Sequence, residues 1–382
     1  MYDLIVIGAG PAGLSAACRA QQNGMNVLVL EKGELANTIF DYQKGKHVMA
    51  EPPMIPLRSD VPFKAGTREF LLQTWSEAAR ASEVKIQRPE EVKGITKSGD
   101  IFTVKTGTGE YNAKYIILAI GIQGNPRTLT VPGASLPHVS TKLADPSIYE
   151  NEDILMVGAG DAAIEGVLAL CEKNRVAVVN RSPEFFRLKD ALFRDITQKV
   201  EMKQVTPFHS AAVERVEEGY AYIKMPEQTV KVKADLVFVR IGAEIPRPFL
   251  ERIGVSFVSA NPTALPVLTK HYETNIPGLF MIGAVAGYGL IKQGMNQGHD
   301  VVEYLLGHDV EAVEEPIIRD QRLGMLQGST DERLNEVRSI TPLLADVPDT
   351  ALRELLLAST VHSDVKARTA IYREDHYSDS LF

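Results

Sequence analysis

The sequence predicts an α/β protein with two three-layer (ββα) domains and a mainly helical C-terminal extension. Two observations predict this fold class: a strand, glycine turn, helix and strand open the chain and recur once within it, and the pattern stops after Gly307. A length of 382 residues, at roughly 150 residues per domain, predicts two or three domains. The composition, 45% hydrophobic and 24% charged, is typical of a globular protein and excludes a disordered or fibrous chain.

The first pattern begins at residue 3. Residues 3–7 predict a buried strand that runs into Gly8-Ala-Gly-Pro-Ala-Gly13, and a helix over 14–23 and a strand over 26–30 follow before Glu31. This order is the Rossmann-like fingerprint of a dinucleotide site. Its glycines permit a tight turn and a close approach of a pyrophosphate to the helix N-terminus, and its acid accepts hydrogen bonds from a ribose. The alternative is a glycine turn with a structural role only.

The same pattern recurs at residues 153–179. A strand leads into GAGDAA at 158–163, and a helix and a second strand follow. No acid ends this second copy, because Asn180-Arg181-Ser182 stands there and Arg187 follows. An arginine at this place can pair with a 2′-phosphate and favours NADPH over NADH. The alternative is that Arg181 is a solvated charge at a strand end.

Further elements are predicted between and after the two copies. Residues 34–66 are rich in proline and glycine, and an irregular segment this long is usually functional or disordered. Other stretches predict a helix over 67–81, strands near 84–86, 101–105, 115–119, 237–241 and 278–283, and an apolar helix that ends at 306.

The order of these motifs resembles the flavoproteins with two dinucleotide-binding domains of the low-molecular-weight thioredoxin reductase type. The resemblance covers about residues 1–310 and rests on four further stretches besides the first fingerprint: Glu31, AIGIQGNPR at 119–127, GAGDAA with the NRS that follows it, and IPGLFMIGAVAGYGLIKQG at 276–294. It implies a discontinuous FAD-binding domain (1–140 and 245–310) and an NAD(P)-binding domain (141–244).

The chain also departs from that family. Thioredoxin reductases of this type carry a CxxC before the second fingerprint, whereas this chain has only Cys18 and Cys171, both in apolar helical patterns that predict core positions. Without an internal dithiol, the electrons must pass to an external acceptor. The stretch ANTIFDY at 36–42, with Phe63, resembles the branch without CxxC, which includes bacillithiol-disulfide reductases and ferredoxin–NADP reductases. The acid that follows the last glycine of the family is Ala284 here, which implies one lost hydrogen bond to the flavin.

The resemblance implies two sets of cofactor-binding residues. The FAD set is Gly8, Gly10, Pro11, Ala12, Gly13, Glu31, Lys32, Thr38, Ile39, His47, Val92, Gly121, Gly283, Ala284, Ile291, Lys292 and Gln293. The NAD(P)H set is Gly158, Gly160, Asp161, Ala162, Asn180, Arg181, Arg187 and Gly242. No catalytic residue is assigned, because the transfer of hydride from nicotinamide to flavin requires no acid–base residue. No metal site is expected, because two lone cysteines form no zinc set.

Several of these assignments have an alternative. The helix that begins near Ile291 is expected to stabilise negative charge on the reduced flavin, or it is an ordinary helix start. His47 faces the cofactor or is a surface histidine, and Tyr288 stacks near the flavin ring or fills the core.

The predicted function is that of an FAD-dependent NAD(P)H oxidoreductase that passes electrons through the flavin to a small disulfide, a ferredoxin-like protein or an attached redox domain. The alternative is a degenerate flavoprotein that acts as a nucleotide or redox sensor, which Ala284 and the C-terminal extension suggest. The resemblance implies a homodimer. The net charge of −8 argues against nucleic-acid and anionic-membrane partners. No signal peptide or membrane-length apolar stretch is present, and a cytoplasmic location is expected.

The extension after Gly307 is expected to comprise a linker (311–332) and a helical segment (333–382). PLLADVPDTALRELLLAST, followed by TAIYREDHYSDSLF, resembles the opening of a cyclic-nucleotide-binding domain without its phosphate-binding cassette. This resemblance implies a third domain that is cut short and cannot bind a cyclic nucleotide by itself. The alternative is a helical dimerisation arm.

Overall fold

The computed structural model describes residues 1–186 and 188–359. These residues form two compact units. The first unit comprises residues 1–50 and 57–308, and the second comprises residues 51–56 together with the chain from 309 onward.

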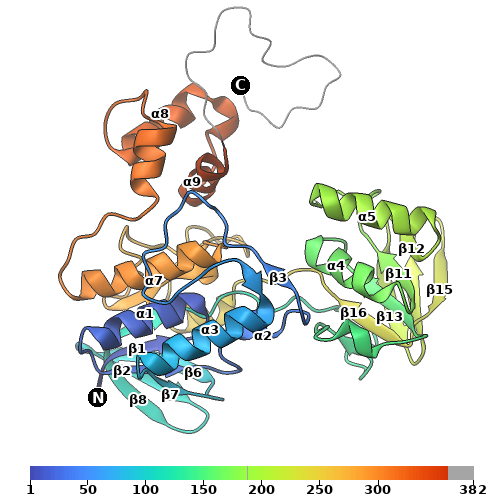
Figure 1. Ribbon diagram of the computed structural model, residues 1–382, viewed down its shortest axis with the longest axis horizontal. Helices are drawn as coiled ribbons and strands as arrows, with labels where there is room; N and C mark the ends of the chain where they lie inside the picture. Colours follow the sequence, from blue (N-terminus) through green and yellow to red (C-terminus); the bar gives the residue numbers. More distant parts are fainter. Residues whose placement is uncertain (187, 360–382) are drawn as a thin grey trace, which may run out of the picture. The chain divides into compact units, whose positions relative to one another are not determined.

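The first unit is built around a seven-stranded sheet (Figure 1). In sheet order the strands are β5 (Lys85–Gln87), β2 (Val27–Leu30), β1 (Tyr2–Ile7), β8 (Glu110–Leu118), β7 (Ile101–Thr106) and β6 (Val92–Ser98), and β17 (Leu279–Met281) pairs with β8. Strand β1 pairs in parallel with β2 and β8, and β17 is parallel to β8. The carboxyl ends of these four strands therefore meet at one edge of the sheet, where open α/β sheets bind their ligands.

Alternate residues of β1 point into two different apolar clusters. Leu4 and Val6 belong to one cluster, and Ile5 and Ile7 belong to the other. A strand that is covered on both faces needs a continuous apolar run, and the sequence supplies one. The three-layer prediction is confirmed for this sheet.

Helices α1 (Pro11–Gln22), α3 (Arg68–Ala81) and α7 (Ile291–Leu305) pack on this sheet (Figure 1). Helix α1 begins three residues earlier than expected, because Pro11 fits the first helical position. It lies so close to α7 that a Cβ atom on Gly298 would come within 2.4 Å of the Ala12 carbonyl oxygen. Thr67 caps α3 by accepting a hydrogen bond from the Phe70 N–H at 3.3 Å.

Short elements complete the first unit. They are α2 (Asn37–Phe40), β3 (His47–Val48), β4 (Gly66–Thr67), α6 (Arg247–Arg252) and two 3₁₀ turns, Pro146–Ile148 and Gly283–Ala286. The pairing of β3 with β4 gives part of the expected irregular segment a regular structure.

The second glycine motif lies on a five-stranded parallel sheet of the same unit. Its strands, in order, are β12 (Val205–Phe208), β11 (Arg175–Val179), β10 (Asp153–Val157), β16 (Leu236–Val239) and β9 (Val139–Ser140). Helices α4 (Asp161–Leu170) and α5 (Asp190–Glu201) contribute to one apolar cluster with β10 and β11. The antiparallel strands β13 (Ala212–Glu217), β14 (Tyr220–Lys224) and β15 (Thr229–Lys233) form a further sheet. The predicted duplication thus extends to a second three-layer arrangement.

The second unit is helical. It contains a π-helix (Ile317–Arg322), α8 (Thr330–Ile340), a 3₁₀ turn (Pro342–Leu344) and α9 (Asp349–Ala358). Ser329 and Glu332 form a reciprocal capping box at the start of α8. Residues 317–322 lie in the segment expected to be a linker, yet Ile317 and Ile318 are buried in the core of this unit. The stretch TAIYREDHYSDSLF lies outside the described residues.

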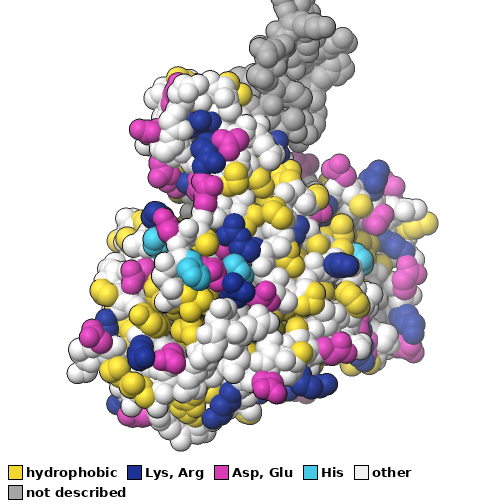
Figure 2. Space-filling view, turned by 60° about the vertical axis from the view of Figure 1, so that its left-hand side comes forward, with side chains coloured by type: hydrophobic (Ala, Val, Ile, Leu, Met, Phe, Trp, Pro, Cys, Tyr) yellow, Lys and Arg dark blue, Asp and Glu magenta, His cyan; other side chains and the backbone are white. Residues whose placement is uncertain are grey.

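Acidic and basic side chains are interspersed over the face shown in Figure 2. Across residues 1–186 and 188–359, no helix combines the length and the apolar character that a bilayer crossing requires.

Candidate functional site

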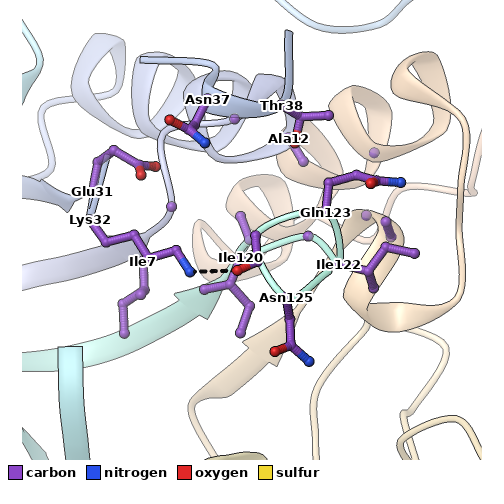
Figure 3. A pocket seen from close by; sticks show the side chains of 18 of the residues that line it. Ile7, Ala12, Glu31, Lys32, Asn37, Thr38, Ile120, Ile122, Gln123 and Asn125 are labelled. Carbon is purple, nitrogen blue, oxygen red and sulfur yellow. Dashed lines mark hydrogen bonds between the residues drawn. The ribbon is translucent and has the colours of Figure 1, made fainter. Parts of the chain in front are cut away.

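A cavity of about 540 Å³ lies at the carboxyl edge of the first sheet (Figure 3). This volume falls within the range of about 300–1,000 Å³ that is usual for ligand and cofactor pockets. The cavity is lined by the glycine turn after β1, the end of β2, the loop after β8 and the start of α7. Segments from both ends of the first unit therefore build one site.

The turn after β1 requires glycine for two different reasons. Gly8 has φ +105°, and a Cβ atom there would lie 2.5 Å from the Ala119 carbonyl oxygen. A Cβ on Gly13 would lie 2.0 Å from the Gly8 oxygen. A Cβ on Gly10, however, would meet no atom of the described residues within 4 Å. Gly10 thus leaves an open space at the N-terminus of α1, which a side chain would fill. The backbone N–H groups at a helix N-terminus favour the binding of a phosphate in such a space.

Glu31 lines the cavity at the end of β2, and its side chain is held from two sides. Oε2 accepts a hydrogen bond from the Ala9 N–H at 2.7 Å, and Oε1 accepts one from the Gly33 N–H at 2.7 Å. The residue is 6% exposed. Each carboxylate oxygen can accept a second hydrogen bond, so the fixed carboxylate can also receive a ribose hydroxyl.

The opposite end of the cavity is formed by the start of α7 and by Gly283 and Ala284. No side chain of the described residues caps the N-terminus of α7. The Gln297 side chain accepts a hydrogen bond from the Gly283 N–H at 2.8 Å, while its buried Nε2 has no partner among the described residues. Gln297 itself does not line the cavity, so its contact positions Gly283, which does. These features fit the FAD that the family implies.

Most of the predicted FAD-binding residues come together around this cavity. Those that line it are Gly8, Gly10, Pro11, Ala12, Glu31, Lys32, Thr38, Ile39, Val92, Gly121, Gly283, Ala284 and Ile291. Gly13, His47, Lys292 and Gln293 do not line it. Gly13 serves the packing of α1 on the turn, and His47 is exposed on β3. Lys292 and Gln293 are buried in the first turn of α7.

Several lining residues were not predicted. Asn37, Gln123, Asn125, Phe249, Arg252 and Leu290 all line the cavity. In Figure 3, Lys32 extends from the end of β2 toward the loop after β8, where its Nζ donates to the Gly124 carbonyl at 3.0 Å. Tyr288, for which stacking and core filling were both open, also lines the cavity. Gln123 and Asn125 lie in the motif at 119–127, and Tyr288 and Leu290 lie in the motif at 276–294, so the sequence could have indicated them. Phe249 and Arg252 lie in α6, where no motif was found.

Charged side chains of both signs line the cavity beyond β2: Glu90, Glu91, Lys32 and Lys93. Hydrogen bonds from Thr106 and Thr108 hold the pKa of Glu90 below its usual value, and a hydrogen bond from Lys93 does the same for Glu91. Both acids therefore remain charged at neutral pH.

The second glycine turn repeats the geometry of the first. Gly158 has φ +115°, and a Cβ atom there would lie 2.1 Å from the Arg240 oxygen, whereas a Cβ on Gly160 would meet nothing within 4 Å among the described residues. Asp161 begins α4, and its Oδ1 accepts from the Lys189 N–H at 3.3 Å. Gly242, with φ +91°, follows β16. Arg187 lies outside the described residues.

The polar side chain that ends β11 is turned inward. Asn180 is 7% exposed, its Oδ1 accepts from the Ser182 N–H at 3.1 Å, and its Nδ2 donates to the Glu184 oxygen at 2.8 Å. Asn180 therefore fixes the turn that presents the exposed Arg181, and the side chain is engaged in these contacts.

Arg240 is a cation near this turn that was not predicted. It follows β16 and donates to the Ala162 oxygen at 3.2 Å and to the Leu143 oxygen at 3.4 Å. Burial lowers the pKa of its guanidinium group, and its Nε has no partner among the described residues. The sequence did not indicate Arg240 as a site residue, because an arginine at the end of an apolar strand belongs to no motif.

The two cysteines are free and buried. Burial raises the pKa of both the Cys18 and the Cys171 thiol, so neither is a reactive thiolate at neutral pH. Within residues 1–186 and 188–359, no group of three or more His, Cys, Asp or Glu side chains could hold a metal ion.

Comparison with known proteins identifies the family. Residues 5–283 match the pyridine nucleotide-disulphide oxidoreductase family. The bacilliredoxin reductase Bdr of Bacillus subtilis is 28% identical over 291 residues, which cover 74% of this chain and 89% of that protein. Ferredoxin–NADP reductase 2 of Shouchella clausii is 27% identical over 303 residues, which cover 76% of this chain and 88% of that protein.

A solved structure shares the fold. That of bacillithiol disulfide reductase Bdr from Staphylococcus aureus matches with a TM-score of 0.74 at 25% identity, over 80% of this chain and 98% of that one. The cavity, the two glycine turns and these matches agree: the chain belongs to the pyridine nucleotide-disulphide oxidoreductase family and is an FAD-dependent NAD(P)H oxidoreductase of the thioredoxin-reductase-like type.

Proposed function

We propose that this protein takes electrons from NADPH and passes them, through FAD held in the cavity, to an acceptor outside the chain. The observation that carries the proposal is the cavity that joins the first glycine turn to the start of α7, in a chain with a second such turn. When bound, FAD supplies the two-electron exchange with nicotinamide. The residues of the chain bind, orient and shield the cofactors.

The proposed roles follow from the geometry. The open turn at Gly10 and the N-terminus of α1 would receive the pyrophosphate, and Glu31 would receive the ribose. The N–H groups at the start of α7 would favour negative charge on the isoalloxazine ring. The proposed FAD domain is residues 1–140 with 245–310, and the proposed NAD(P) domain is residues 141–244. The first range contains the seven-stranded sheet, in which β1, β2, β5, β8 and β17 are parallel and β6 and β7 are antiparallel. The second range contains four of the five strands of the parallel sheet, because β9 ends at Ser140.

The preference for NADPH is supported by the end of β11. No acid stands there, Asn180 is engaged in the turn, and Arg181 is exposed. A ribose 2′-hydroxyl lacks a carboxylate partner at this place, whereas a 2′-phosphate can pair with the guanidinium of Arg181.

The acceptor is proposed to be a small disulfide or a ferredoxin-like redox protein. The sequence contains no cysteine pair, and its two thiols are buried, so an internal dithiol relay is absent. The names of two similar proteins, a bacillithiol disulfide reductase and a ferredoxin–NADP reductase, correspond to these two acceptor classes. An attached redox domain is the third form that the acceptor could take.

The test is a spectroscopic titration of the purified protein. FAD should give the protein a visible flavin band, and NADPH should bleach this band under anaerobic conditions at a lower concentration than NADH. Arg181→Ala should remove the difference between the two nucleotides. Reoxidation of the bleached protein by a low-molecular-weight disulfide or by an oxidised ferredoxin then separates the acceptor classes. A protein that binds FAD but is not bleached by either nucleotide would instead support the sensor.

The proposal has three further parts. They are a homodimer, a cytoplasmic setting, and a C-terminal segment that is either the opening of a cyclic-nucleotide-binding domain or a dimerisation arm. Comparing the molar mass of the full chain in solution with that of a chain ending at residue 308 tests the arm, because only an arm makes the dimer depend on the extension.

A further inference from the structure

The core of the second unit contains a side chain from far upstream in the sequence. Residues 51–56 lie between β3 and β4, yet they fold with the chain after 309. Ile55 is 0% exposed and shares one apolar cluster with Ile318, Leu334 and Leu352. A guanidinium nitrogen of Arg322 lies 3.4 Å from the Met54 sulfur. The second unit therefore includes a short segment from the sequence between β3 and β4.

Three residues after Ile55, the chain is fixed to α7 within the first unit. The Arg58 N–H donates to Asn296 Oδ1 at 2.8 Å, and its guanidinium pairs with Asp300 Oδ1 at 2.8 Å. Asp300 is 1% exposed, so this charge depends on its partners. The Nδ1 of His299 lies 3.2 Å from the same Asp300 oxygen.

Helix α7 reaches the cofactor cavity at its other end. Ile291 and Gly294 line the cavity, and Asn296 follows within the next turn of the helix. The contacts of Arg58 thus hold the second and third turns of the helix whose first turn faces the proposed flavin site.

The connection between Ile55 and Arg58 is short. Two intervening residues, Pro56 and Leu57, let their Cα atoms separate by at most about 11 Å. The proline also fixes one backbone angle, which removes part of the freedom that could absorb a displacement. A change that releases Ile55 from the helical core therefore alters the restraint on Arg58.

We propose that the C-terminal helical unit regulates the flavin end of α7 through residues 55–58, which act as a strap. When the helical unit is folded, Ile55 is held and Arg58 is restrained on Asn296 and Asp300. When the helical unit opens, the strap gains conformational freedom, and ordering Arg58 costs more entropy. The helix then loses its restraint near the cofactor.

The test is amide hydrogen exchange of the full-length protein, compared between Ile55→Ala and Leu343→Ala. Both side chains belong to the second unit, but Ile55 is fully buried and Leu343 is 72% exposed. Truncating a buried isoleucine should raise exchange in the core of the second unit by about 30-fold or more. If the strap transmits this loss, the amide exchange rate should also rise by about tenfold in residues 57–61 and 295–300 of the first unit. Exchange can report on these segments separately, because different parts of a protein open with different free energies. Leu343→Ala should change neither region.

Two further variants separate transmission from general loosening. Leu352→Ala disturbs the helical core without changing any residue of the strap, and it should raise exchange in residues 57–61 as well. Arg58→Met removes the guanidinium pair with Asp300 and leaves the backbone N–H on Asn296, so adding Ile55→Ala to it should raise exchange in 295–300 less than Ile55→Ala does in the parent. A rise confined to the second unit would overturn the proposal, and so would a uniform rise that includes β1 and β8.

A second measurement is the rate at which FAD is released, and its expected result rests on the proposed function. Ile55→Ala should speed release by about tenfold, in line with the loss of restraint on a packed element. If the protein binds no FAD but exchange still rises in 57–61 and 295–300, the proposed function fails and the strap stands. If FAD binds and only the helical unit responds, the strap fails and the proposed function stands.

Discussion

The carboxylate of Glu31 accepts a hydrogen bond from the backbone N–H of Ala9 at 2.7 Å, which ties the acid that ends β2 to the glycine turn that follows β1. Two segments that we propose to bind different parts of a dinucleotide are thus fixed to each other inside the protein. The contact is buried, since Glu31 is 6% exposed. The acid therefore serves the fold in addition to its proposed role toward the ligand.

Replacing Glu31 with glutamine should therefore affect both stability and binding. The amide cannot accept at both positions, so a buried N–H is left without a partner at a cost of about 1–3 kcal/mol. We expect a lower free energy of unfolding in urea and a dissociation constant for FAD raised by about tenfold or more. Glu34→Gln is the control, because Glu34 is half-exposed and pairs only at the surface with Arg88. Equal effects of the two substitutions would contradict this account.

The glycines of the first turn should separate folding from binding. Gly8→Ala places a methyl group 2.5 Å from the Ala119 oxygen at a positive φ, so it should destabilise the fold by at least about 2 kcal/mol. Gly10→Ala meets open space, so its unfolding free energy should stay within about 0.5 kcal/mol of the parent. Its affinity for FAD, measured by flavin fluorescence, should nevertheless fall. Unchanged FAD binding in Gly10→Ala would show that the turn has a structural role only.

Placing an acid after Gly283, which follows β17, should strengthen the binding of the cofactor. Ala284 lines the cavity, and the resembling flavoproteins carry an acid at the matching position. One added hydrogen bond, worth about 0.5–1.5 kcal/mol, should lower the dissociation constant for FAD by about two- to tenfold in Ala284→Asp. Ala284→Asn tests whether shape alone suffices. A weaker affinity in Ala284→Asp would mean that the cavity does not present the flavin chain to this residue.

An acid at the start of β10 should make the second sheet sensitive to low pH. Hydrogen bonds from Arg175 and then Lys233 lower the pKa of Asp153 to about 2. Because the folded pKa lies below the usual value of 3.8, this stabilisation is complete above about pH 4 and is lost as the pH falls toward 2.

Asp153→Asn should accordingly reduce the free energy of unfolding by about 1 kcal/mol at neutral pH, the scale of a partly exposed charged hydrogen bond. The difference from the parent should shrink between pH 4 and pH 2 in urea unfolding curves. Asp100→Asn, in the exposed β6–β7 turn, should show no such trend. A difference that is independent of pH would exclude the ionised Asp153 as its cause.

Local patterns predicted the elements that build the site. The apolar run before Gly8 identifies β1 because a strand covered on both faces must be apolar throughout. The positive φ of Gly8 and Gly158, and the close approach at Gly13, follow from glycine chemistry that is visible in the motif itself. These features depend on neighbours in the sequence, so they could be identified before the chain path was known.

The sequence by itself therefore determined the two glycine-turn folds, the acid that ends β2 and the absence of a cysteine pair. Only the tertiary structure decided that Lys32 reaches the Gly124 carbonyl and that Phe249 of α6 lines the cavity. It also decided that Ile55 is buried among helices more than 250 residues downstream. The physical reason is that such contacts join segments with no shared local pattern, and the chain path that brings them together is set by the packing of the whole fold.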